Sequence, residues 1–406
     1  MNSSYSQIFV NSDRANVLAK RHPWIWDTTI IEPSVPLAPG TVVDLRMPDG
    51  RFVGRGIYNS ASRIRVRVYQ WTENPRLDEV WLRDRLACAC RLREQWQLAT
   101  GDSLTALRLV NSEGDGLSGL VIDRFGEFAV VQVTAAAVMA WLPAIAAWLA
   151  ERYTLAGVWL RIDEKMAKSE GIPPEQRLLW GRQPDGPIVI QEHDVQLSID
   201  LTAGQKTGYY LDQRANRLAA ARWMRGRMLD VCTYVGGFAL AACRHGRVGE
   251  IVAVDSSARA LAAASHNAAL NGFQNIQFIE ADCFDELARL QNANERFDGI
   301  VLDPPRLAGS RDNQAAALRA YHRLNHSAIQ LLEDGGILVS CSCSGRVTRE
   351  EFIGVLTAAA RRAGRTLQIL EQRGADSDHP WEAACPESEY LKCIICRVTE
   401  GNKKWS

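Results

Sequence analysis

The stretch RMLDVCTYVGGFALAACRHGRVGEIVAVD, residues 227–255, decides the fold class of this chain. It opens on an apolar segment that predicts a buried strand and closes on a second one, EIVAVD. Between them, Gly236 and Gly237 let the backbone turn tightly and approach a ligand closely. Asp255 ends the second strand, at about the distance downstream where dinucleotide-binding folds place the acid for ribose hydroxyls. The pattern predicts an α/β domain that binds a nucleotide-like cofactor.

The same alternation of strand and helix continues along the C-terminal part of the chain. Three more apolar segments, IQFIEAD, DGIVLDPP and GGILVSCSCS, follow, with helical stretches such as SARALAAASHNAALNG between them. Alternation of this kind predicts a parallel sheet that is covered on both faces. Because ligands bind at the carboxyl ends of such strands, the residues that end each strand are the candidate site.

The first three strand ends are the candidate cofactor site. The third ends in Asp282 and Cys283, which suit the amine and ring edge of an adenine. The glycines lack the G-x-G-x-x-G spacing and the domain lies late in the chain, which argues against NAD and for S-adenosylmethionine. The alternative is that Asp255 and Asp282 only cap helices. The candidate cofactor-binding residues are Tyr210, Asp230, Tyr234, Gly236, Gly237, Phe238, Asp255, Asp282, Cys283 and Asp303.

The fourth and fifth strand ends carry the candidate catalytic residues, Asp303 and Cys343. Two prolines follow Asp303 and hold it rigidly, so its carboxyl group can hydrogen-bond a flat nucleobase edge. Carbon 5 of cytosine is too weak a nucleophile to attack a sulfonium, but a thiolate that adds to carbon 6 makes carbon 5 enamine-like. The presence of Cys343 therefore predicts methylation at carbon 5 of cytosine. Asp303 would donate a proton to ring nitrogen 3 or share one with it. The alternative is that Cys343 is a buried strand cysteine, as we predict for Cys341, which lies deeper on the same strand face.

The N-terminal part of the chain predicts two further domains. Residues 1–75 predict short strands, with a hairpin turn at the PDG of residues 48–50, and residues 76–200 predict a middle α+β domain before the domain at 201–406. In residues 63–69 arginine alternates with apolar residues, which predicts one buried strand face and one exposed face. The exposed face is either a solvated surface or a surface for RNA backbone. The candidate RNA-binding residues of this part of the chain are Arg63, Arg65 and Arg67 on that face, together with Arg55 earlier in the sequence.

The composition bounds the class of protein. With 406 residues, 47% hydrophobic and 23% charged, the chain is typical of a globular protein of two or three domains. The formal net charge is zero, and residues 1–100 hold 14 Lys and Arg against 10 Asp and Glu, a weak surplus for phosphate binding. We find no apolar run long enough for a membrane helix and no secretion signal, so we expect a cytoplasmic protein without a membrane partner. The ten cysteines show no second pair at ligand spacing, so we expect no metal and free thiols.

Several motifs together resemble the RlmI family of bacterial 23S ribosomal RNA cytosine-5 methyltransferases over nearly the whole chain. They are GQKTGYYLDQR at 204–214, YVGGF at 234–238, DPP at 303–305 and SCSG at 342–345. HPW at 22–24 and GRGIYN at 54–59 look like the PUA domain of that family, and residues 111–123 look like its middle domain. The resemblance implies an N-terminal β-rich PUA barrel for RNA, a middle α+β domain, and a Rossmann-like class I methyltransferase with a mainly parallel seven-stranded sheet. It also implies S-adenosylmethionine as cofactor, Cys343 as nucleophile, and 23S rRNA or a large-subunit assembly intermediate as partner.

Residues 204–214 precede the first strand of the C-terminal domain and predict a lid over the cofactor pocket. Tyr210 is a candidate for stacking on the methionine part of the cofactor or on the target base. Lys206 and Arg214 are candidates for contacts to RNA phosphate. The alternative is a solvated connector followed by a capped helix.

Three functions stay open at this point. The first is an enzyme that makes 5-methylcytosine in large-subunit rRNA, and the second is a guanine methyltransferase of rRNA that uses Asp303-Pro304-Pro305 without a cysteine nucleophile. The third is a non-catalytic RNA-binding assembly factor. The sequence leaves open which nucleotide is the target and whether the protein forms a homodimer.

Overall fold

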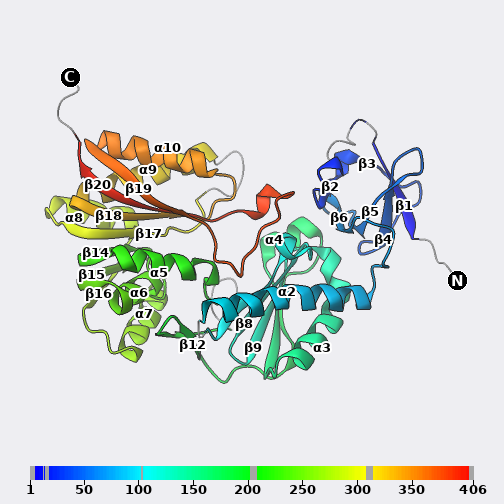
Figure 1. Cartoon of the computed structure of the whole chain (residues 1–406), viewed down its shortest axis with the longest axis horizontal. Helices are drawn as coiled ribbons and strands as arrows, with labels where there is room; N and C mark the ends of the chain where they lie inside the picture. Colours follow the sequence, from blue (N-terminus) through cyan, green and yellow to red (C-terminus); the bar gives the residue numbers. More distant parts are fainter. Residues whose placement is uncertain are drawn as a thin grey trace. The chain divides into compact units, whose positions relative to one another are not determined.

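The computed structural model describes residues 5–11, 13, 18–101, 104–201, 208–307 and 314–401. The chain forms two compact units, coloured by position in the chain in Figure 1. The N-terminal unit comprises residues 1–190, 200–211 and 377–388. The C-terminal unit comprises residues 191–199, 212–376 and 389–406.

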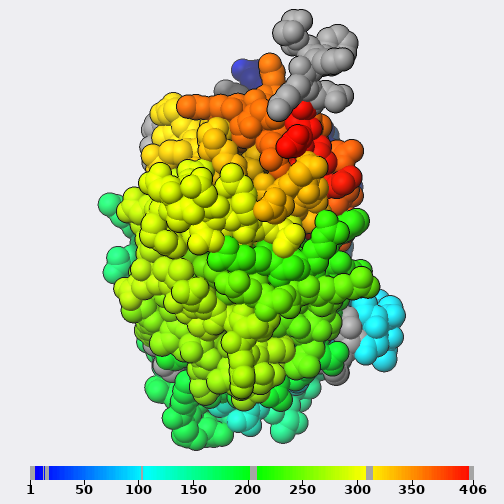
Figure 2. All heavy atoms as spheres, turned by 90° about the vertical axis from the view of Figure 1, so that its left-hand side faces the viewer, coloured from blue at the N-terminus to red at the C-terminus, as the bar shows by residue number. Residues whose placement is uncertain are grey.

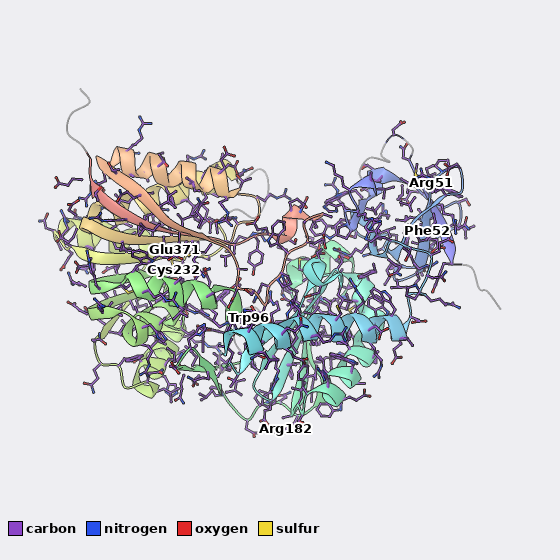
Figure 3. All side chains as sticks on the ribbon, in the orientation of Figure 1. Arg51, Phe52, Trp96, Arg182, Cys232 and Glu371 are labelled. Carbon is purple, nitrogen blue, oxygen red and sulfur yellow. The ribbon has the colours of Figure 1, made fainter. Side chains whose placement is uncertain are left out.

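A six-stranded sheet in the order β2-β6-β5-β4-β1-β3 begins the N-terminal unit. Its elements are β1 (Ser6–Val10), β2 (Trp24–Trp26), η2 (Asp27–Thr29), β3 (Ile30–Ile31), β4 (Val42–Arg46), β5 (Phe52–Tyr58) and β6 (Ile64–Gln70). The expected hairpin forms between β4 and β5, which pair antiparallel, with Gly50 at a φ of +87° in the turn. Figure 3 labels Arg51 and Phe52, which follow this turn. On β6, Val66 and Val68 are buried in the core of this sheet, as the alternating pattern predicts.

A five-stranded sheet in the order β11-β10-β9-β8-β7 forms the second core of this unit. Its elements are α2 (Glu79–Thr100), β7 (Ala106–Asn111), η3 (Ser112–Asp115), β8 (Leu120–Phe125), β9 (Phe128–Val133), η4 (Ala136–Trp141), α3 (Leu142–Arg152), β10 (Gly157–Ile162), α4 (Glu164–Glu170) and β11 (Glu175–Gly181). Asp78 caps the start of helix α2, because its side chain accepts a hydrogen bond from the backbone N–H of Trp81, and Gly101 in the left-handed region caps its end. Leu82 and Leu86 on one face of α2 are fully buried in this core.

A seven-stranded sheet in the order β16-β15-β14-β17-β18-β20-β19 forms the C-terminal unit. Its strands are β14 (Arg225–Val231), β15 (Arg247–Asp255), β16 (Ile276–Glu280), β17 (Phe297–Leu302), β18 (Leu332–Ser342), β19 (Arg365–Arg373) and β20 (Lys392–Glu400). The first five strands of that order are parallel, and β20 runs antiparallel to both of its neighbours. The expected α/β fold with a mainly parallel seven-stranded sheet is confirmed.

Helices cover both faces of this sheet. They are α5 (Arg214–Trp223), α6 (Gly237–His245), α7 (Ala258–Leu270), α8 (Cys283–Asn292), α9 (Gln314–Leu331) and α10 (Arg349–Arg362). Successive residues of one strand enter different cores, because Leu302 packs with α8, α9 and α10 whereas Val301 packs with α5 and α6. This two-sided burial explains why the strands are continuous apolar runs. Figure 2 shows an outer surface of this unit, in green to orange.

The short connecting elements are β12 (Ile188–Glu192), β13 (Val195–Ile199), η5 (Leu211–Gln213) and η6 (Pro386–Ser388). Strands β12 and β13 pair with each other in a two-stranded ribbon. Among the residues that the structure describes, no helix is both long enough and apolar enough to span a bilayer.

Candidate active site

The carboxyl ends of adjacent parallel strands meet at one edge of the C-terminal sheet. Val231 pairs with Val254 on one side and with Leu302 on the other, and Leu302 pairs with Ser340. Residues that directly follow these positions therefore lie on neighbouring strand ends. They include Cys232 (labelled in Figure 3), Asp255, Asp303 and Cys341. The edge thus joins the strand ends that the sequence singles out.

The turn after β14 is built from left-handed backbone positions. Gly236 has a φ of +88°, which glycine adopts without strain, and Cys232 has a φ of +63°. Asp230 closes the turn because its Oδ2 accepts hydrogen bonds from Thr233 Oγ1 at 2.6 Å and from the backbone N–H of Ala239 at 3.1 Å. Burial raises the pKa of Asp230 to about 6. Its Oδ1 is buried and has no hydrogen-bond partner among the described residues.

Asp255 ends β15 and accepts hydrogen bonds from two backbone N–H groups. Tyr234 donates to Oδ2 at 2.9 Å and Ser257 donates to Oδ1 at 2.9 Å. The cap of α7 is Ser257 itself, so Asp255 is not the helix cap that the alternative interpretation required. Each carboxylate oxygen has a second lone pair, which leaves Asp255 able to accept two ribose hydroxyls.

Asp282 differs from Asp255, because it is the N-cap of α8. Its Oδ1 accepts hydrogen bonds from the backbone N–H groups of Phe284 at 2.8 Å and Asp285 at 3.3 Å. The helix-capping alternative therefore describes a real role of Asp282. Cys283 is the first residue of α8, and a hydrogen bond from the Cys232 thiol lowers the pKa of its own thiol.

The glycine turn, the spare acceptor capacity of Asp255 and the open Oδ1 of Asp230 fit S-adenosylmethionine, which brings a ribose with two hydroxyls and a charged methionine part. Gly237 opens α6 and contributes backbone. Phe238 is buried among the side chains of the sheet core, so only its backbone is predicted to contact the cofactor. Which of these residues contact the cofactor stays a prediction.

Replacing Asp255 with asparagine is expected to weaken binding of S-adenosylhomocysteine by about 10- to 100-fold, because hydrogen bonds to a charged group contribute about 1.5–3 kcal/mol. Isothermal titration calorimetry measures the change. Asp285→Asn, an exposed acid in the first turn of α8, is the matched control and should bind as the parent does. Equal affinity in Asp255→Asn and the control would remove Asp255 from the cofactor site.

Asp303 follows β17 and is a half-buried acid. Burial, together with the negative charges of Asp212 and Asp230, raises the pKa of Asp303 to about 7. Gln213 fixes the carboxyl group by donating from Nε2 to Oδ1 at 3.0 Å. An acid with a pKa near neutrality can both give and take a proton at physiological pH.

The two cysteines at the end of β18 have different surroundings. Cys341 is fully buried and lies opposite Cys393 on β20. A hydrogen bond to the Cys393 thiol and burial raise the pKa of Cys341, so it stays a thiol, and its predicted place in the core is confirmed. Cys343 lies just beyond the strand and is partly exposed. Of the two, only Cys343 has a side chain that a substrate can reach.

The backbone around Cys343 is held by buried polar groups. Ser342 and Ser344, on either side of it, each hydrogen-bond the buried hydroxyl of Tyr321 at 3.0 Å. Lys392 on β20 donates from Nζ to the backbone oxygen of Ser344 at 2.7 Å. These contacts fix both neighbours of Cys343 and leave its own side chain accessible.

Two of the four arginines predicted to bind RNA are buried, namely Arg55 and, from the alternating row, Arg67. Arg55 is 5% exposed and its Nε lies 2.7 Å from Asp44 Oδ1. Arg67 is 6% exposed and its Nη2 lies 3.0 Å from Glu170 Oε1. The alternating pattern predicted exposure of Arg67, but buried carboxylates on other elements pair with both guanidinium groups. They are internal ion pairs, with no exposed charge to offer to RNA.

The other two arginines of the row reach the surface. Arg63 is exposed and lies over the ring of Trp26 at 6.0 Å. Arg65 is partly exposed and its Nε lies 3.0 Å from Glu32 Oε1. An RNA-binding role of Arg63 and Arg65 stays a prediction.

The segment predicted as a lid is only partly described. Residues 204–207, and with them Lys206, lie outside the described residues. Arg214 is 1% exposed and its Nε lies 2.8 Å from Asp376 Oδ2, so the predicted phosphate contact is corrected to a buried ion pair. Tyr210 is partly buried and belongs to the N-terminal unit. Its place in the cofactor site stays a prediction.

Sequence reasoning missed three residues of the C-terminal unit that surround the candidate catalytic groups. They are Gln213, which fixes Asp303, and Tyr321 and Lys392, which fix the segment around Cys343. One signal was present, because a lysine inside the apolar run LKCIIC is unusual for a buried strand. Tyr321 carries no such signal, since its hydroxyl finds the serines only in the folded sheet.

Among the residues that the structure describes, one group of potential metal ligands lies in the N-terminal unit, where His22, Cys385 and Glu387 offer ligand atoms within 4.8 Å of one another. His22 Nδ1 accepts a hydrogen bond from the backbone N–H of Trp24 at 3.0 Å. The proton of the neutral ring is therefore on Nε2, which donates to Glu387 Oε2 at 3.1 Å. In this tautomer Nε2 carries a proton and Nδ1 accepts a hydrogen bond, so neither ring nitrogen is free to bind a metal.

Comparisons with known proteins agree with this architecture. The profile of a PUA-like domain matches residues 8–71, and that of a methyltransferase domain matches residues 225–396. The crystal structure of a methyltransferase complexed with S-adenosylhomocysteine superposes with a TM-score of 0.83 at 21% identity, over 97% of this chain and 100% of that chain. A SAM-dependent methyltransferase from Streptococcus mutans gives a TM-score of 0.80 at 20% identity, with the same coverage.

Fold and strand-end site together define an S-adenosylmethionine-dependent class I methyltransferase that carries a PUA-like domain. The protein is 37% identical over 395 residues to "Ribosomal RNA large subunit methyltransferase I" of Shewanella amazonensis, covering 97% of this chain and 99% of that protein. It is 37% identical over 388 residues to the protein of the same name from Escherichia coli O139:H28, covering 95% and 97%. The chain belongs to the ribosomal RNA large subunit methyltransferase I family.

Proposed function

We propose that this protein methylates carbon 5 of a cytosine in 23S rRNA through a thiolate adduct of Cys343. The observation that carries the proposal is the contrast at the end of β18. There Cys341 is buried, whereas Cys343, two residues later, is accessible. The neighbouring strand β17 leads into Asp303, an acid with a pKa of about 7. The printed names of the relatives support a large-subunit rRNA substrate.

The chemistry begins with Cys343. Its thiolate adds to carbon 6 of the cytosine, a carbon–sulfur bond forms, and the electron pair of the 5,6 double bond moves into the ring. Asp303, protonated in part near neutral pH, gives a proton to ring nitrogen 3 and so neutralises that charge. Carbon 5 is then nucleophilic.

When bound, S-adenosylmethionine supplies the electrophilic methyl group that carbon 5 accepts. Carbon 5 then loses its proton to water, the electron pair restores the 5,6 double bond, and ring nitrogen 3 returns its proton to Asp303. The bond from carbon 6 to Cys343 breaks and the thiolate leaves. Gln213 keeps the carboxyl group of Asp303 in one orientation throughout, through its hydrogen bond of 3.0 Å.

We assign RNA binding to a PUA domain at residues 1–75, with a middle domain at 76–200 and the methyltransferase domain at 201–406. The match of a PUA-like profile to residues 8–71 supports the first boundary. Arg63 and Arg65 are the candidate RNA contacts that remain there, with free 23S rRNA or a large-subunit assembly intermediate as substrate. Such a substrate places the protein in the cytoplasm.

RNA that contains 5-fluorocytidine tests the adduct. Fluorine at carbon 5 cannot leave as a cation, so the sulfur–carbon bond cannot be released after methyl transfer. We expect a covalent protein–RNA complex that resists denaturing electrophoresis and requires S-adenosylmethionine, with the nucleotide attached to the Cys343 peptide in mass spectrometry. Attachment at another cysteine would assign the nucleophile elsewhere, and no complex with an RNA that the protein methylates would contradict the proposed chemistry.

A further inference from the structure

Lys392 is a buried charge in an apolar strand. It is 3% exposed, it is the first residue of β20, and it lies opposite Ser342 in the antiparallel pair of β18 and β20. The residues before and after it, Leu391 and Cys393, are buried as well. An ammonium group at such a position is unfavourable unless neighbouring groups compensate its charge.

The hydrogen bonds of Lys392 provide only part of that compensation. Its Nζ donates to the backbone oxygen of Ser344 at 2.7 Å and to that of Tyr390 at 2.9 Å. These two acceptors are neutral carbonyl groups, and an ammonium has three N–H donors. Ser344 directly follows Cys343, so the cation is held beside the segment that carries this thiol.

The ionisable groups around Lys392 identify the compensating charge. Burial lowers the pKa of Lys392 to about 8, and the Cys343 side chain opposes that shift more than any other ionisable neighbour. Arg349 and Arg306 add positive charge and Glu389 adds negative charge. Glu389 is paired with Arg349 Nη2 at 2.7 Å, so these two largely neutralise each other. Cys343 is left as the neighbour whose negative form best balances the ammonium.

We propose that the Lys392 ammonium, held by the carbonyl groups of Ser344 and Tyr390, stabilises the Cys343 thiolate and is a positioning residue for the nucleophile. The proposal rests on the proposed function in assigning Cys343 the attack on the base. A free thiol has a pKa of about 8.5, so without such a cation only a small fraction would be thiolate at neutral pH. An ammonium at this position raises that fraction, and its own deprotonation at high pH removes the effect.

The test is the pH dependence of alkylation of Cys343 by iodoacetamide, measured peptide by peptide in the full-length protein by mass spectrometry. We expect Lys392→Met to raise the midpoint of the Cys343 profile by about one pH unit or more, and to slow alkylation at pH 7 by about 10-fold. The rate at high pH should stay as in the parent. Cys88, exposed on α2, is the internal control whose profile should not move.

Two more variants separate charge from packing. Lys392→Gln is also neutral but keeps an N–H donor, and should shift the midpoint as Lys392→Met does. Lys392→Arg keeps the charge and should leave the midpoint near the parent value. Melting temperature and S-adenosylhomocysteine binding report whether each variant is folded. An unchanged Cys343 midpoint in a folded neutral variant would overturn the proposal.

The outcome is independent of the proposed reaction, because alkylation needs neither RNA nor methyl transfer. If the 5-fluorocytidine adduct fails while the midpoint shifts, the proposed function is wrong and the charge interaction stands. If the adduct forms and the midpoint does not shift, Lys392 is a packing residue. In the active enzyme, the acid limb of the pH profile of kcat/KM should move upward in Lys392→Gln.

Discussion

Replacing Cys343 with alanine is expected to abolish methylation, with a fall in kcat of about 10⁴-fold or more, because the loss of a nucleophile removes the whole covalent pathway. Binding of S-adenosylhomocysteine should stay within about twofold of the parent, since Cys343 lies outside the glycine turn and is distinct from Asp255, the predicted ligand of the ribose hydroxyls. Transfer of tritiated methyl groups to 23S rRNA measures the first quantity and calorimetry the second.

Cys341→Ala is the matched control for this variant. Cys341 is buried beside Cys393 and should be replaceable with a modest loss of stability and near-parental activity. If Cys341→Ala is inactive and Cys343→Ala is active, the two cysteines exchange roles. Activity in both variants would point to a reaction that uses no thiol, such as methylation of a guanine.

Replacing Asp303 with asparagine is expected to lower kcat by about 10²- to 10⁴-fold, the usual contribution of a positioned acid or base. Asparagine keeps the size and a hydrogen-bond donor but cannot transfer a proton to ring nitrogen 3. The parent should lose activity as the pH rises through about 7, because the carboxyl group with that pKa becomes ionised. The residual activity of Asp303→Asn should lack this alkaline limb.

Gln213→Leu is the companion variant, because it removes the hydrogen bond to Asp303 without touching the acid. That hydrogen bond lowers the pKa of Asp303, so its loss should move the alkaline limb to higher pH. A pH profile of kcat measured from pH 5 to pH 9 separates the two variants. An alkaline limb that persists in Asp303→Asn would assign it to another group.

Much of the C-terminal unit could be predicted because its strands are buried on both faces. Continuous apolar runs such as DGIVLDPP mark the strands, and the residue after each run marks an edge that a parallel sheet must share. The sequence therefore predicts Asp255 and Asp303 at the same edge of the sheet, where their strands β15 and β17 lie on either side of β14. The capping of α8 by Asp282 is a local feature that the sequence could offer only as an alternative.

The arginines show why the N-terminal prediction failed in part. A period of two gives the side of a strand on which a residue lies, but it does not show what packs on that side. Here Arg67 meets Glu113 and Glu170, which are far from it in the sequence, and its charge is paired inside the unit. The roles of Gln213 and Lys392 could not be predicted for the same reason, because they depend on contacts between elements that lie far apart in the sequence.

The most direct test of the central claim is the identity of the methylated nucleoside. The purified protein is incubated with S-adenosylmethionine and 23S rRNA that lacks modifications, the RNA is digested, and the nucleosides are identified by mass spectrometry, with Cys343→Ala in parallel. We predict 5-methylcytidine with the parent protein and none with the variant. A methylguanosine, or 5-methylcytidine at the parental level from Cys343→Ala, would contradict the account.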